Sequence, residues 1–363
     1  PDEGPISGGD FGPYRQSERK HIYEKYIDIL INNGSAYYAY DTPEELAIAR
    51  EKSEKKGESF RYGSHNRHLF NNSLSISNEN ISKNVSKKHV VRLKVEPGRQ
   101  IHVFDEIRGN ISVSSSLIDD KILMKADGMP TYHFANVVDD KLMSISTVIR
   151  GEEWLPSLPT HKLIYDAFGW KTPKFMHLPL ILKPNGKGKL SKRDGEKGGF
   201  PVFPIKWSQE ISGFRESGFL PNAVVNYLAL LGWNNGNEDE IFSLKELIKS
   251  FNIKGIQKAG ARFDYEKAKW LNHQYISKTS TDELLPLIET QKALKNFSKK
   301  KQNKIIDLLK NRLYTLKDIE KEGSFLIEPY PYDEKNIVKL KKNDTIEILN
   351  KIIKLLETDL ELK

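Results

Sequence analysis

The sequence predicts an α/β fold built on a buried parallel sheet, followed by a mainly helical region. Two apolar segments, ISTVIRG and FMHLPLIL, flank a helical pattern over residues 159–168. A strand, a helix and a strand in this order are typical of a parallel sheet covered by helices. Beyond Gly195, helix-capping signals and helical apolar periods dominate, so the second half of the chain is expected to be helical.

Length and composition predict a folded protein of two or three domains. The chain has 363 residues, of which 38% are hydrophobic and 29% are charged, and domains commonly contain about 100–200 residues. The absence of cysteine excludes disulfides, cysteine nucleophiles and thiolate zinc sites. The formal charge of +8 would attract polyanions, but a charge of this size does not by itself identify a nucleic acid as the partner.

The sequence has no stretch near the roughly 18 apolar residues that span a bilayer. Its first residues, PDEGPISGGDFGPYRQSERK, lack the apolar core of a signal peptide. We therefore expect a cytoplasmic protein with no membrane partner. The opening has no initiator Met, and the last residues, KIIKLLETDLELK, form a helical pattern without a stop signal, so truncation at both ends is expected.

Two helices are expected before the first strand pattern. Residues 17–33 place apolar side chains on one helical face, and Gly34 suits the position just after a helix end. The sequence Thr-Pro-Glu-Glu, starting at Thr42, combines a capping box with proline in the first turn and opens a second helix. The polar span 57–88 is expected to be an elaborated surface.

Strand patterns begin after His89. The segments VVRLKV and IHVFDEIRGNISVS, on either side of a Pro-Gly turn, alternate β-branched and polar residues. Such alternation is typical of antiparallel strands with one buried face. A small β-containing subdomain is therefore expected here.

Three helix starts are marked beyond Gly195. Pro221 begins an apolar run that stops at a glycine, Ser243 opens a capping box, and Asp264 can cap the helix after it. Residues 292–312 then hold eight Lys or Arg against one Asp. Such a run is either a solvated helix face or a surface for RNA, and the run alone does not decide between them.

The most informative loop is KGKLSKRDG, residues 187–195, which follows the apolar segment that ends near Leu182. Its glycines permit exposed backbone N–H groups, and its fixed positive charges can offset the charge that develops on phosphoryl oxygens. As a bare pattern it is either an exposed turn or a phosphate-binding loop.

Several segments together resemble one family. KLSKR is similar to the KMSKS signature of class I aminoacyl-tRNA synthetases. The segments DEGP, GPYRQSER, DGMPTYHFANVVDD, VIRGEEW, HxLxYxAFGW and HLPLIL stand in the order seen in bacterial-type glutamyl-tRNA synthetases. Several motifs in a fixed order are far more specific than any one of them. The resemblance implies ATP-dependent ligation of glutamate to tRNA-Glu through a glutamyl-adenylate.

In that family the lysines of this signature stabilise the α-phosphate while the glutamate carboxylate displaces pyrophosphate. The resemblance therefore implies that Lys192 is the leading catalytic residue and that Lys189 assists it, through positioning and electrostatics. ATP and Mg²⁺ are the implied cofactors. The implied ATP-binding residues are Glu153, Leu180, Ile181, Lys189, Leu190, Ser191 and Lys192. For Leu180 and Ile181, core packing is the alternative interpretation.

Arg150 follows an apolar strand, and a guanidinium can bind the side-chain carboxylate of glutamate with two hydrogen bonds. Taken alone, Arg150 could equally be an ion-pair partner of Glu152 or Asp140. The match of VIRGEEW to the family favours the functional interpretation. The implied glutamate-binding residues are Tyr132, Asn136, Arg150 and Trp154, with core packing as the alternative for Trp154.

The resemblance also implies a tRNA surface on the helical region. Arg312, in LLKNRLYTL, matches the family position where an arginine helps to read the last anticodon base, and Lys300 and Lys301 would contact phosphates. A solvated arginine on a basic helix is the alternative. The implied partners are glutamate and tRNA-Glu, with tRNA-Gln as a second candidate, and the protein is expected to be a monomer.

Two departures from the family pattern matter. The His-Ile-Gly-His signature, which contacts ATP phosphates, is absent from the 363 residues, as is the N-terminal strand that helps to hold the α-amino group of glutamate. Since DEGP follows these elements in the family, sequence upstream of Pro1 is expected to be missing and the chain alone to be inactive. No zinc or other protein-bound metal is expected, because some relatives hold zinc through cysteines and this chain has none.

The resemblance implies three regions. A class I, Rossmann-like α/β catalytic domain without its N-terminal part covers residues 1–194, with an α/β acceptor-stem insertion over about 14–129. A helical stem-contact region follows over 195–272, and then an all-α anticodon-binding region over 273–363. The rivals are a glutaminyl or non-discriminating synthetase, a catalytically incomplete tRNA-binding fragment, and a truncated paralogue that modifies a tRNA base.

Overall fold

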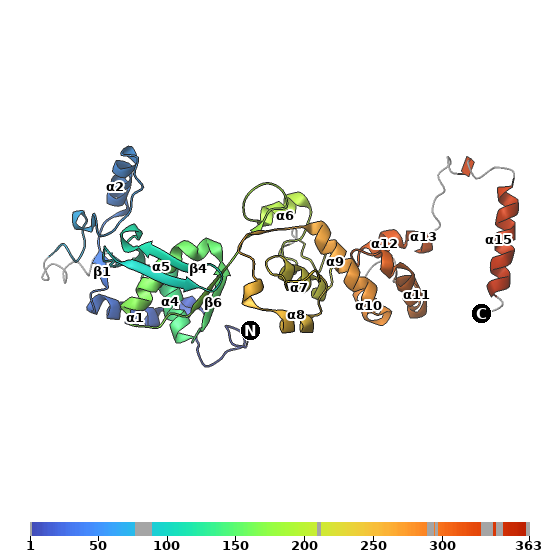
Figure 1. Ribbon diagram of the computed structural model, residues 1–363, viewed down its shortest axis with the longest axis horizontal. Helices are drawn as coiled ribbons and strands as arrows, with labels where there is room; N and C mark the ends of the chain where they lie inside the picture. Colours follow the sequence, from blue (N-terminus) through green and yellow to red (C-terminus); the bar gives the residue numbers. More distant parts are fainter. Residues whose placement is uncertain are drawn as a thin grey trace. The chain divides into compact units, whose positions relative to one another are not determined.

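The computed structural model describes residues 2–76, 89–208, 212–288, 294, 297–327, 337–338 and 344–360. The chain divides into two compact units, whose elements are labelled in Figure 1. The first unit contains Pro1–Leu190, Leu231–Glu238 and Ser250–Phe263. The second contains Ser191–Leu230, Asp239–Lys249 and Asp264–Lys363. Over the described ranges, no helix is long and apolar enough to cross a membrane.

The first unit combines helices with three small sheets. Its helices are η1 (Gln16–Glu18), α1 (Lys20–Asn32), α2 (Pro43–Lys55), η2 (Arg67–Leu69), η3 (Ser115–Leu117), α4 (Tyr132–Leu142), η4 (Glu152–Ser157), α5 (Leu158–Ala167) and η5 (Ile253–Gly255). Its strands are β1 (Ala36–Ala39), β2 (Val90–Leu93), β3 (Gln100–Asp105), β4 (Gly109–Ser114), β5 (Ile122–Met124), β6 (Thr147–Gly151), β7 (Lys174–Leu178), β8 (Ile181–Leu182) and β9 (Ala261–Arg262).

The helix signals in the N-terminal part are confirmed. The helix α1 ends before Gly34, which has a φ of +76° and so takes the left-handed conformation that suits glycine. At the start of α2, Glu45 N donates to Thr42 Oγ1 over 3.2 Å, and Thr42 N donates to Glu45 Oε2 over 2.8 Å. Both hydrogen bonds of the predicted capping box are therefore formed.

The predicted parallel sheet is confirmed, since β6 and β7 pair in parallel with η4 and α5 between them in the chain. The strand order is β4-β3-β7-β6, and a separate antiparallel sheet has the order β1-β2-β5. The expectation of a distinct β subdomain after His89 is wrong for β3 and β4, which extend the parallel sheet. The alternation that predicted these strands reports a buried face and does not specify which sheet a strand joins.

The sequence predicted that FMHLPLIL forms one continuous strand, and this prediction is wrong. The strand β7 ends at Leu178, and β8 pairs with β9 in a separate two-stranded sheet. Pro179 has no N–H group with which to continue the hydrogen-bond ladder. The next amide, Leu180 N, donates to Glu152 Oε1 over 3.1 Å. The apolar run therefore serves two sheets.

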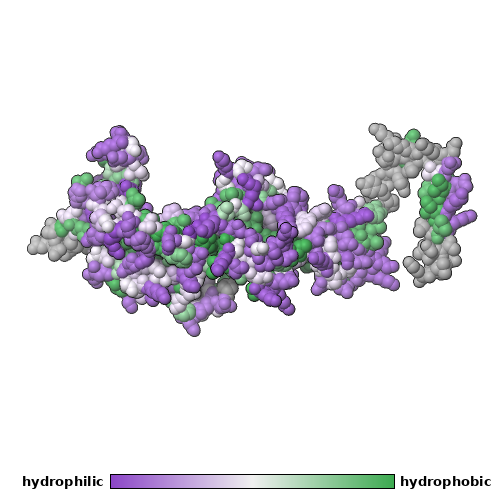
Figure 2. Space-filling model, in the orientation of Figure 1, coloured by the Kyte–Doolittle hydropathy of each residue, from purple (hydrophilic) through white to green (hydrophobic). Residues whose placement is uncertain are grey.

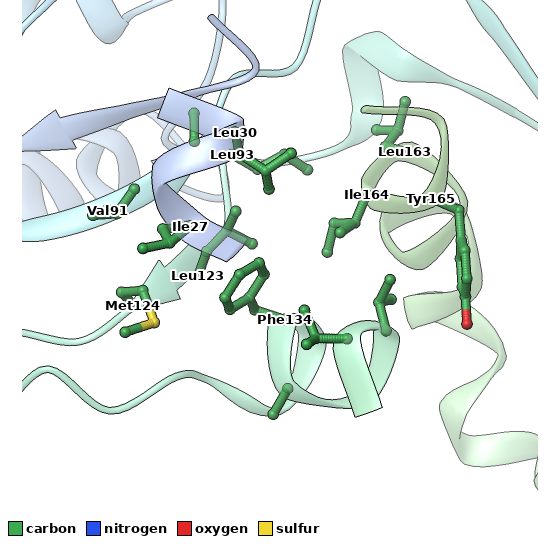
Figure 3. Close-up of a cluster of buried hydrophobic side chains, with 14 of the residues drawn as sticks. Ile27, Leu30, Val91, Leu93, Leu123, Met124, Phe134, Leu163, Ile164 and Tyr165 are labelled. Atoms are coloured by element: carbon green, nitrogen blue, oxygen red, sulfur yellow. The ribbon is translucent and has the colours of Figure 1, made fainter. Parts of the chain in front are cut away.

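The core of the first unit lies between α1, α4, α5 and the β1-β2-β5 sheet, as Figure 3 shows. The side chains labelled there come from these elements and are almost fully buried: Ile27, Leu30, Val91, Leu93, Leu123, Met124, Phe134, Leu163, Ile164 and Tyr165. The helix α4 was not predicted, although Phe134, Val137 and Val138 have helical spacing and are fully buried. This core fixes α4 and α5, which carry side chains of the site described below.

The described part of the second unit is helical. Its elements are α6 (Lys192–Gly198), α7 (Pro221–Leu230), α8 (Leu244–Ser250), α9 (Tyr265–Lys278), α10 (Thr281–Ile288), α11 (Lys299–Leu309), η6 (Lys310–Arg312), α12 (Asp318–Glu322), α13 (Ser324–Ile327) and α15 (Thr345–Leu360). The predicted starts at Pro221, Ser243 and Asp264 are confirmed, and Asp264 Oδ1 accepts from Lys267 N over 2.9 Å.

One apolar core joins the helices α7, α9, α10 and α11. Buried Asn272, on α9, accepts from Leu220 N over 2.8 Å and donates to Tyr314 O over 2.7 Å, which links three stretches of the chain. The helix α9 is continuous through residue 273, where the sequence analysis placed a domain boundary. On α15, apolar and hydrophilic side chains lie on opposite sides of the helix (Figure 2).

Candidate active site

Arg150, near the end of β6, is the centre of a cluster of polar side chains in the first unit. Its Nε donates to His177 Nε2 over 3.0 Å, and one terminal nitrogen donates to Tyr132 Oη over 3.0 Å. The other terminal nitrogen lies 3.4 Å from His161 Nδ1. Each nitrogen of the guanidinium therefore has one partner within the protein.

Both histidines that contact Arg150 are fully buried. Burial, reinforced by the charge of Arg150, lowers the pKa of His161 to about 2. Burial also lowers the pKa of His177 below its ordinary value, although its hydrogen bond to Asp105 acts in the opposite direction. The two imidazoles that hold Arg150 are therefore neutral at ordinary pH.

Asp105 lies behind His177, at the end of β3. Its fully buried carboxylate lies 2.7 Å from His177 Nδ1 and accepts the backbone N–H groups of Ile107, Arg108 and His177 over 3.0, 2.8 and 3.1 Å. Because a carboxylate only accepts hydrogen bonds, His177 carries its proton on Nδ1 and offers Nε2 to Arg150. Asp105 thereby sets the tautomer of the histidine that holds Arg150.

The structural alternative for Arg150 was an ion pair with Glu152 or Asp140. None of the ion pairs among the described residues includes Arg150, and Glu152 pairs with Arg108 over 2.7 Å. Burial raises the pKa of Asp140 to about 6, while the charge of Arg150 and a hydrogen bond to Asn136 lower it. Arg150 therefore influences Asp140 through space without an ion pair.

Tyr132 and Trp154 form an aromatic wall beside Arg150. Their ring centroids are 4.4 Å apart, and the two residues are 41% and 38% exposed, so neither is a core residue. Asn136 lies one turn after Tyr132 on α4, and its side chain is engaged with Asp140. Of the four residues expected to bind glutamate, Tyr132, Arg150 and Trp154 are thus in contact, whereas Asn136 makes no described contact with the other three.

A second cluster joins the end of β6 to the basic loop. Lys189 Nζ forms an ion pair with Glu153 Oε1, which holds the pKa of the Glu153 carboxyl below its usual value. Gly151 makes this possible, because a Cβ atom there would lie 2.0 Å from Glu153 Oε2. Two residues expected to bind ATP, Glu153 and Lys189, therefore lie together in the first unit.

The basic loop is anchored to the sheet on both sides. Leu190 N donates to Ile181 O over 2.8 Å, and Lys183 N donates to Gly188 O over 3.1 Å. From β9, one terminal nitrogen of Arg262 contacts three carbonyls just before the loop, those of Lys183, Pro184 and Gly186, over 2.8, 3.3 and 3.0 Å. Ile181 is 36% exposed, but its carbonyl and the N–H of Leu180 are already engaged.

The remaining signature residues belong to the second unit. Ser191 precedes α6, and its N and Oγ donate to Asp194 Oδ2 over 2.8 and 2.5 Å. Lys192 begins α6, and its Nζ lies 4.1 Å from the ring centroid of Trp207 and 5.2 Å from that of Phe203. The two rings are stacked with centroids 4.9 Å apart. An ammonium over aromatic faces is stabilised by their quadrupoles.

The tRNA candidates lie on exposed helices of the second unit. Lys300 and Lys301 are in the first turn of α11, and Lys301 Nζ lies 4.0 Å from the ring centroid of Phe297. Arg312 ends η6, is exposed, and is in none of the described ion pairs. Lys292 and Lys295, which contributed to the basic run in the sequence, lie outside the described residues.

No role for His133, His161, His177 or Asp105 was expected from the sequence. Three of them stand inside motifs that carry the family resemblance: His133 in DGMPTYHFANVVDD, His161 in HxLxYxAFGW and His177 in HLPLIL. A signal was available for His177, which stands in the otherwise apolar run FMHLPLIL, where a polar side chain is expected to be buried and hydrogen-bonded. Over the described ranges, no group of three or more His, Asp or Glu residues could hold a metal ion.

Two sequence families match the chain. The profile described as "tRNA synthetases class I (E and Q), catalytic domain" matches residues 6–270, and the one described as "Anticodon binding domain" matches residues 275–361. A glutamate–tRNA ligase of Flavobacterium johnsoniae is 50% identical over 355 residues, which are 96% of this chain and 71% of that protein. One of Phocaeicola vulgatus is 47% identical and covers 98% and 72%.

Solved structures agree with these sequence matches. The crystal structure of a glutamate tRNA ligase from Elizabethkingia meningosepticum in complex with its amino acid has a TM-score of 0.91 and 46% identity, and the match covers 97% of this chain and 72% of that one. The glutamate-tRNA synthetase of Elizabethkingia anophelis has a TM-score of 0.87 and 47% identity, with coverage of 93% and 70%.

Proposed function

Because this chain belongs to the class I tRNA synthetases for glutamate and glutamine, and is a glutamate–tRNA ligase that uses ATP, we propose that Arg150 selects the amino acid. The observation that carries this proposal is the guanidinium itself, whose three nitrogens bond, among the described residues, to the uncharged side chains of Tyr132, His161 and His177. A guanidinium has five N–H donors, so one remains on each terminal nitrogen. That pair of donors suits a carboxylate.

We first define the enzyme in which activity is to be measured. The extended enzyme is this 363-residue chain joined to the family's N-terminal segment, which carries the His-Ile-Gly-His signature. Glutamate activation is followed by exchange of pyrophosphate with ATP in the presence of glutamate and tRNA.

Replacing Arg150 with Gln in the extended enzyme should raise the KM for glutamate by about 10- to 100-fold, the effect of losing a hydrogen bond to a charged group. The KM for ATP should change far less, because the proposed nucleotide site lies at Glu153 and Lys189. A matched control is Arg15→Gln, at an exposed arginine paired with Glu18, which should leave both constants unchanged. An unaltered KM for glutamate in Arg150→Gln would show that Arg150 has a structural role and does not bind the substrate.

The residues proposed to meet ATP in the first unit are Glu153, Leu180, Ile181, Lys189 and Leu190. Ser191 and Lys192, of the second unit, are proposed from the KLSKR signature. Lys189 is already paired with Glu153, so ATP phosphates would replace or share this partner. The hydroxyl of Ser191 is engaged with Asp194, and only groups other than that hydroxyl are proposed to meet ATP. Both lysines act by charge on phosphoryl oxygens, and neither acts as a nucleophile.

Mg²⁺ is implied together with ATP, and the described residues include no group of three or more His, Asp or Glu side chains that could hold a metal ion. This ion commonly keeps several waters and binds substrate phosphates together with one or two carboxylates. We propose that it accompanies ATP as a counter-ion of the phosphates, and no step of the mechanism runs through it.

For tRNA, we propose that the basic helix α11 sets affinity and that Arg312 reads the anticodon. Arg312→Gln should relax discrimination between tRNA-Glu and tRNA-Gln by about 1–3 kcal/mol, as expected for loss of a base contact. Lys300→Ala is the matched control, since an exposed phosphate contact should weaken both tRNAs alike and reduce the salt dependence. Aminoacylation kinetics of the extended enzyme with each tRNA measure both effects. Equal losses for the two tRNAs in Arg312→Gln would reduce Arg312 to a phosphate contact.

The helical second unit bears on the rival interpretations. A glutaminyl enzyme would carry a β-barrel anticodon module, whereas the described residues after Asp264 are helical. A truncated paralogue that modifies a tRNA base would lack this helical region. Whether tRNA-Gln is also a substrate is tested by the Arg312 experiment. We further propose a monomeric, cytoplasmic enzyme, which sedimentation and cell fractionation would test.

A further inference from the structure

Arg150 differs from three enclosed arginines of the first unit that pair with carboxylates, whereas buried Arg92 donates to the backbone carbonyl of Asp120 and lies over the ring of Tyr62. Arg19, Arg67 and Arg108, whose side chains are 1%, 12% and 17% exposed, each pair with a carboxylate over 2.7–3.0 Å. Such pairing is the usual way in which a protein compensates a sequestered charge. Arg150 is instead held by two imidazoles and a phenol, and it enters none of the described ion pairs.

The three partners hold the guanidinium without cancelling its charge. Arginine only donates hydrogen bonds, so His161 must accept through Nδ1 and carry its own proton on Nε2. His161 Nε2 lies 3.1 Å from His133 Nδ1, which is then the acceptor of that proton. On the other side, Asp105 holds the proton of His177 on Nδ1 and frees Nε2 for Arg150. Every tautomer in the cluster is thus assigned by donor and acceptor chemistry.

We propose that His161 and His177 are positioning residues that fix the plane of the Arg150 guanidinium through neutral acceptors, so that its positive charge is left for the side-chain carboxylate of the substrate. This inference rests on the proposed role of Arg150. A carboxylate partner inside the protein would fix the same plane but would compete with the substrate for the charge. Neutral partners favour glutamate over glutamine, because an uncharged amide gains little from an uncompensated cation.

The test compares His161→Asn with His161→Asp in the extended enzyme. Both side chains place an oxygen near the position of His161 Nδ1, and they differ only in charge. His161→Asn should stay within about threefold of the wild-type KM for glutamate, while His161→Asp should raise that KM by about 10- to 100-fold over His161→Asn, with a smaller change in kcat. The preference for glutamate over glutamine should fall in His161→Asp alone. Equal KM values for the two variants would overturn the proposal.

Arg150→Gln, measured in parallel, separates this inference from the proposed function. If Arg150→Gln raises the KM while the two His161 variants remain alike, only the role of the neutral partners is wrong. If Arg150→Gln has no effect, both proposals fail.

A measurement on the unaltered 363-residue chain covers the case in which a His161 variant does not fold. The ¹⁵N resonances of the imidazoles, recorded at about pH 7, should show His177 neutral with its proton on Nδ1. His161 should be neutral with its proton on Nε2. A positively charged imidazole at either position would contradict the assignment.

Discussion

The extended enzyme with Lys192→Ala should activate glutamate about 10²–10³ times more slowly than the unaltered extended enzyme, the effect of removing one preorganised electrostatic donor. The KM for ATP should change less, because a charge that acts mainly in the transition state contributes to kcat more than to binding. Single-turnover formation of the adenylate measures the rate constant directly.

Lys197→Ala is the matched control for Lys192→Ala. Both lysines lie on α6, Lys192 at its first residue and Lys197 in its last turn. Lys192 rests on the rings of Phe203 and Trp207, so its removal could also loosen this part of the unit. Lys192→Arg keeps the charge and should recover part of the rate if charge is what matters. A rate constant for Lys192→Ala equal to that of Lys197→Ala would remove Lys192 from the mechanism.

The 363-residue chain alone should exchange pyrophosphate at close to the background rate. It carries one of the two phosphate-binding signatures of the family, KLSKR, and the His-Ile-Gly-His signature is absent from its sequence. In the family the two signatures contact the ATP phosphates from opposite sides, and losing one of them removes preorganised charge from the transition state. Adding the segment that carries the second signature should restore exchange.

Robust exchange by the 363-residue chain would show that residues within it replace the missing signature. A tRNA-binding assay on the same chain is the control for folding, because the proposed tRNA surface lies in the basic helical region and needs no adenylate chemistry. Binding without exchange is the expected combination.

Much of the fold could be predicted, because local signals coincided with tertiary structure. The capping box at Thr42, the caps at Ser243 and Asp264 and the glycine at position 34 act within one turn of the chain, and all are formed. The parallel pairing of β6 and β7 followed from an apolar strand, a helix and another apolar strand. These signals need no information about distant residues.

The errors concern sheet membership and continuity, which depend on distant partners. The strands β3 and β4 join β7 through one parallel pairing at Asp105, which no local pattern encodes. The apolar run after Lys174 was predicted to form one strand, because its continuous hydrophobicity is typical of a buried strand. The proline at position 179 in fact separates β7 from β8.

The candidate site could be predicted in part. The resemblance identified Tyr132, Arg150 and Trp154, which lie together, and Glu153 and Lys189, which form an ion pair. It did not identify His161, His177 or Asp105, because the family pattern assigned them no role, although His177 stands out as a histidine within an apolar run. Asp105 lies on a strand far from Arg150 in the chain, so only the sheet brings the two near each other.

The interruption of the strand at Pro179 has a consequence for the length of the amino-acid side chain that the site accepts. On the proposed roles, the side-chain carboxylate of the amino acid meets Arg150, and ATP phosphates meet Lys189. Arg150 is held by β6 and by His177 of β7, and Lys189 is bridged to Leu182 of β8, just beyond the proline. Because the side-chain carboxylate is held at Arg150 while the α-carboxylate must reach the ATP held at Lys189, we expect an aspartate side chain, one methylene shorter, to leave Arg150 without its partner.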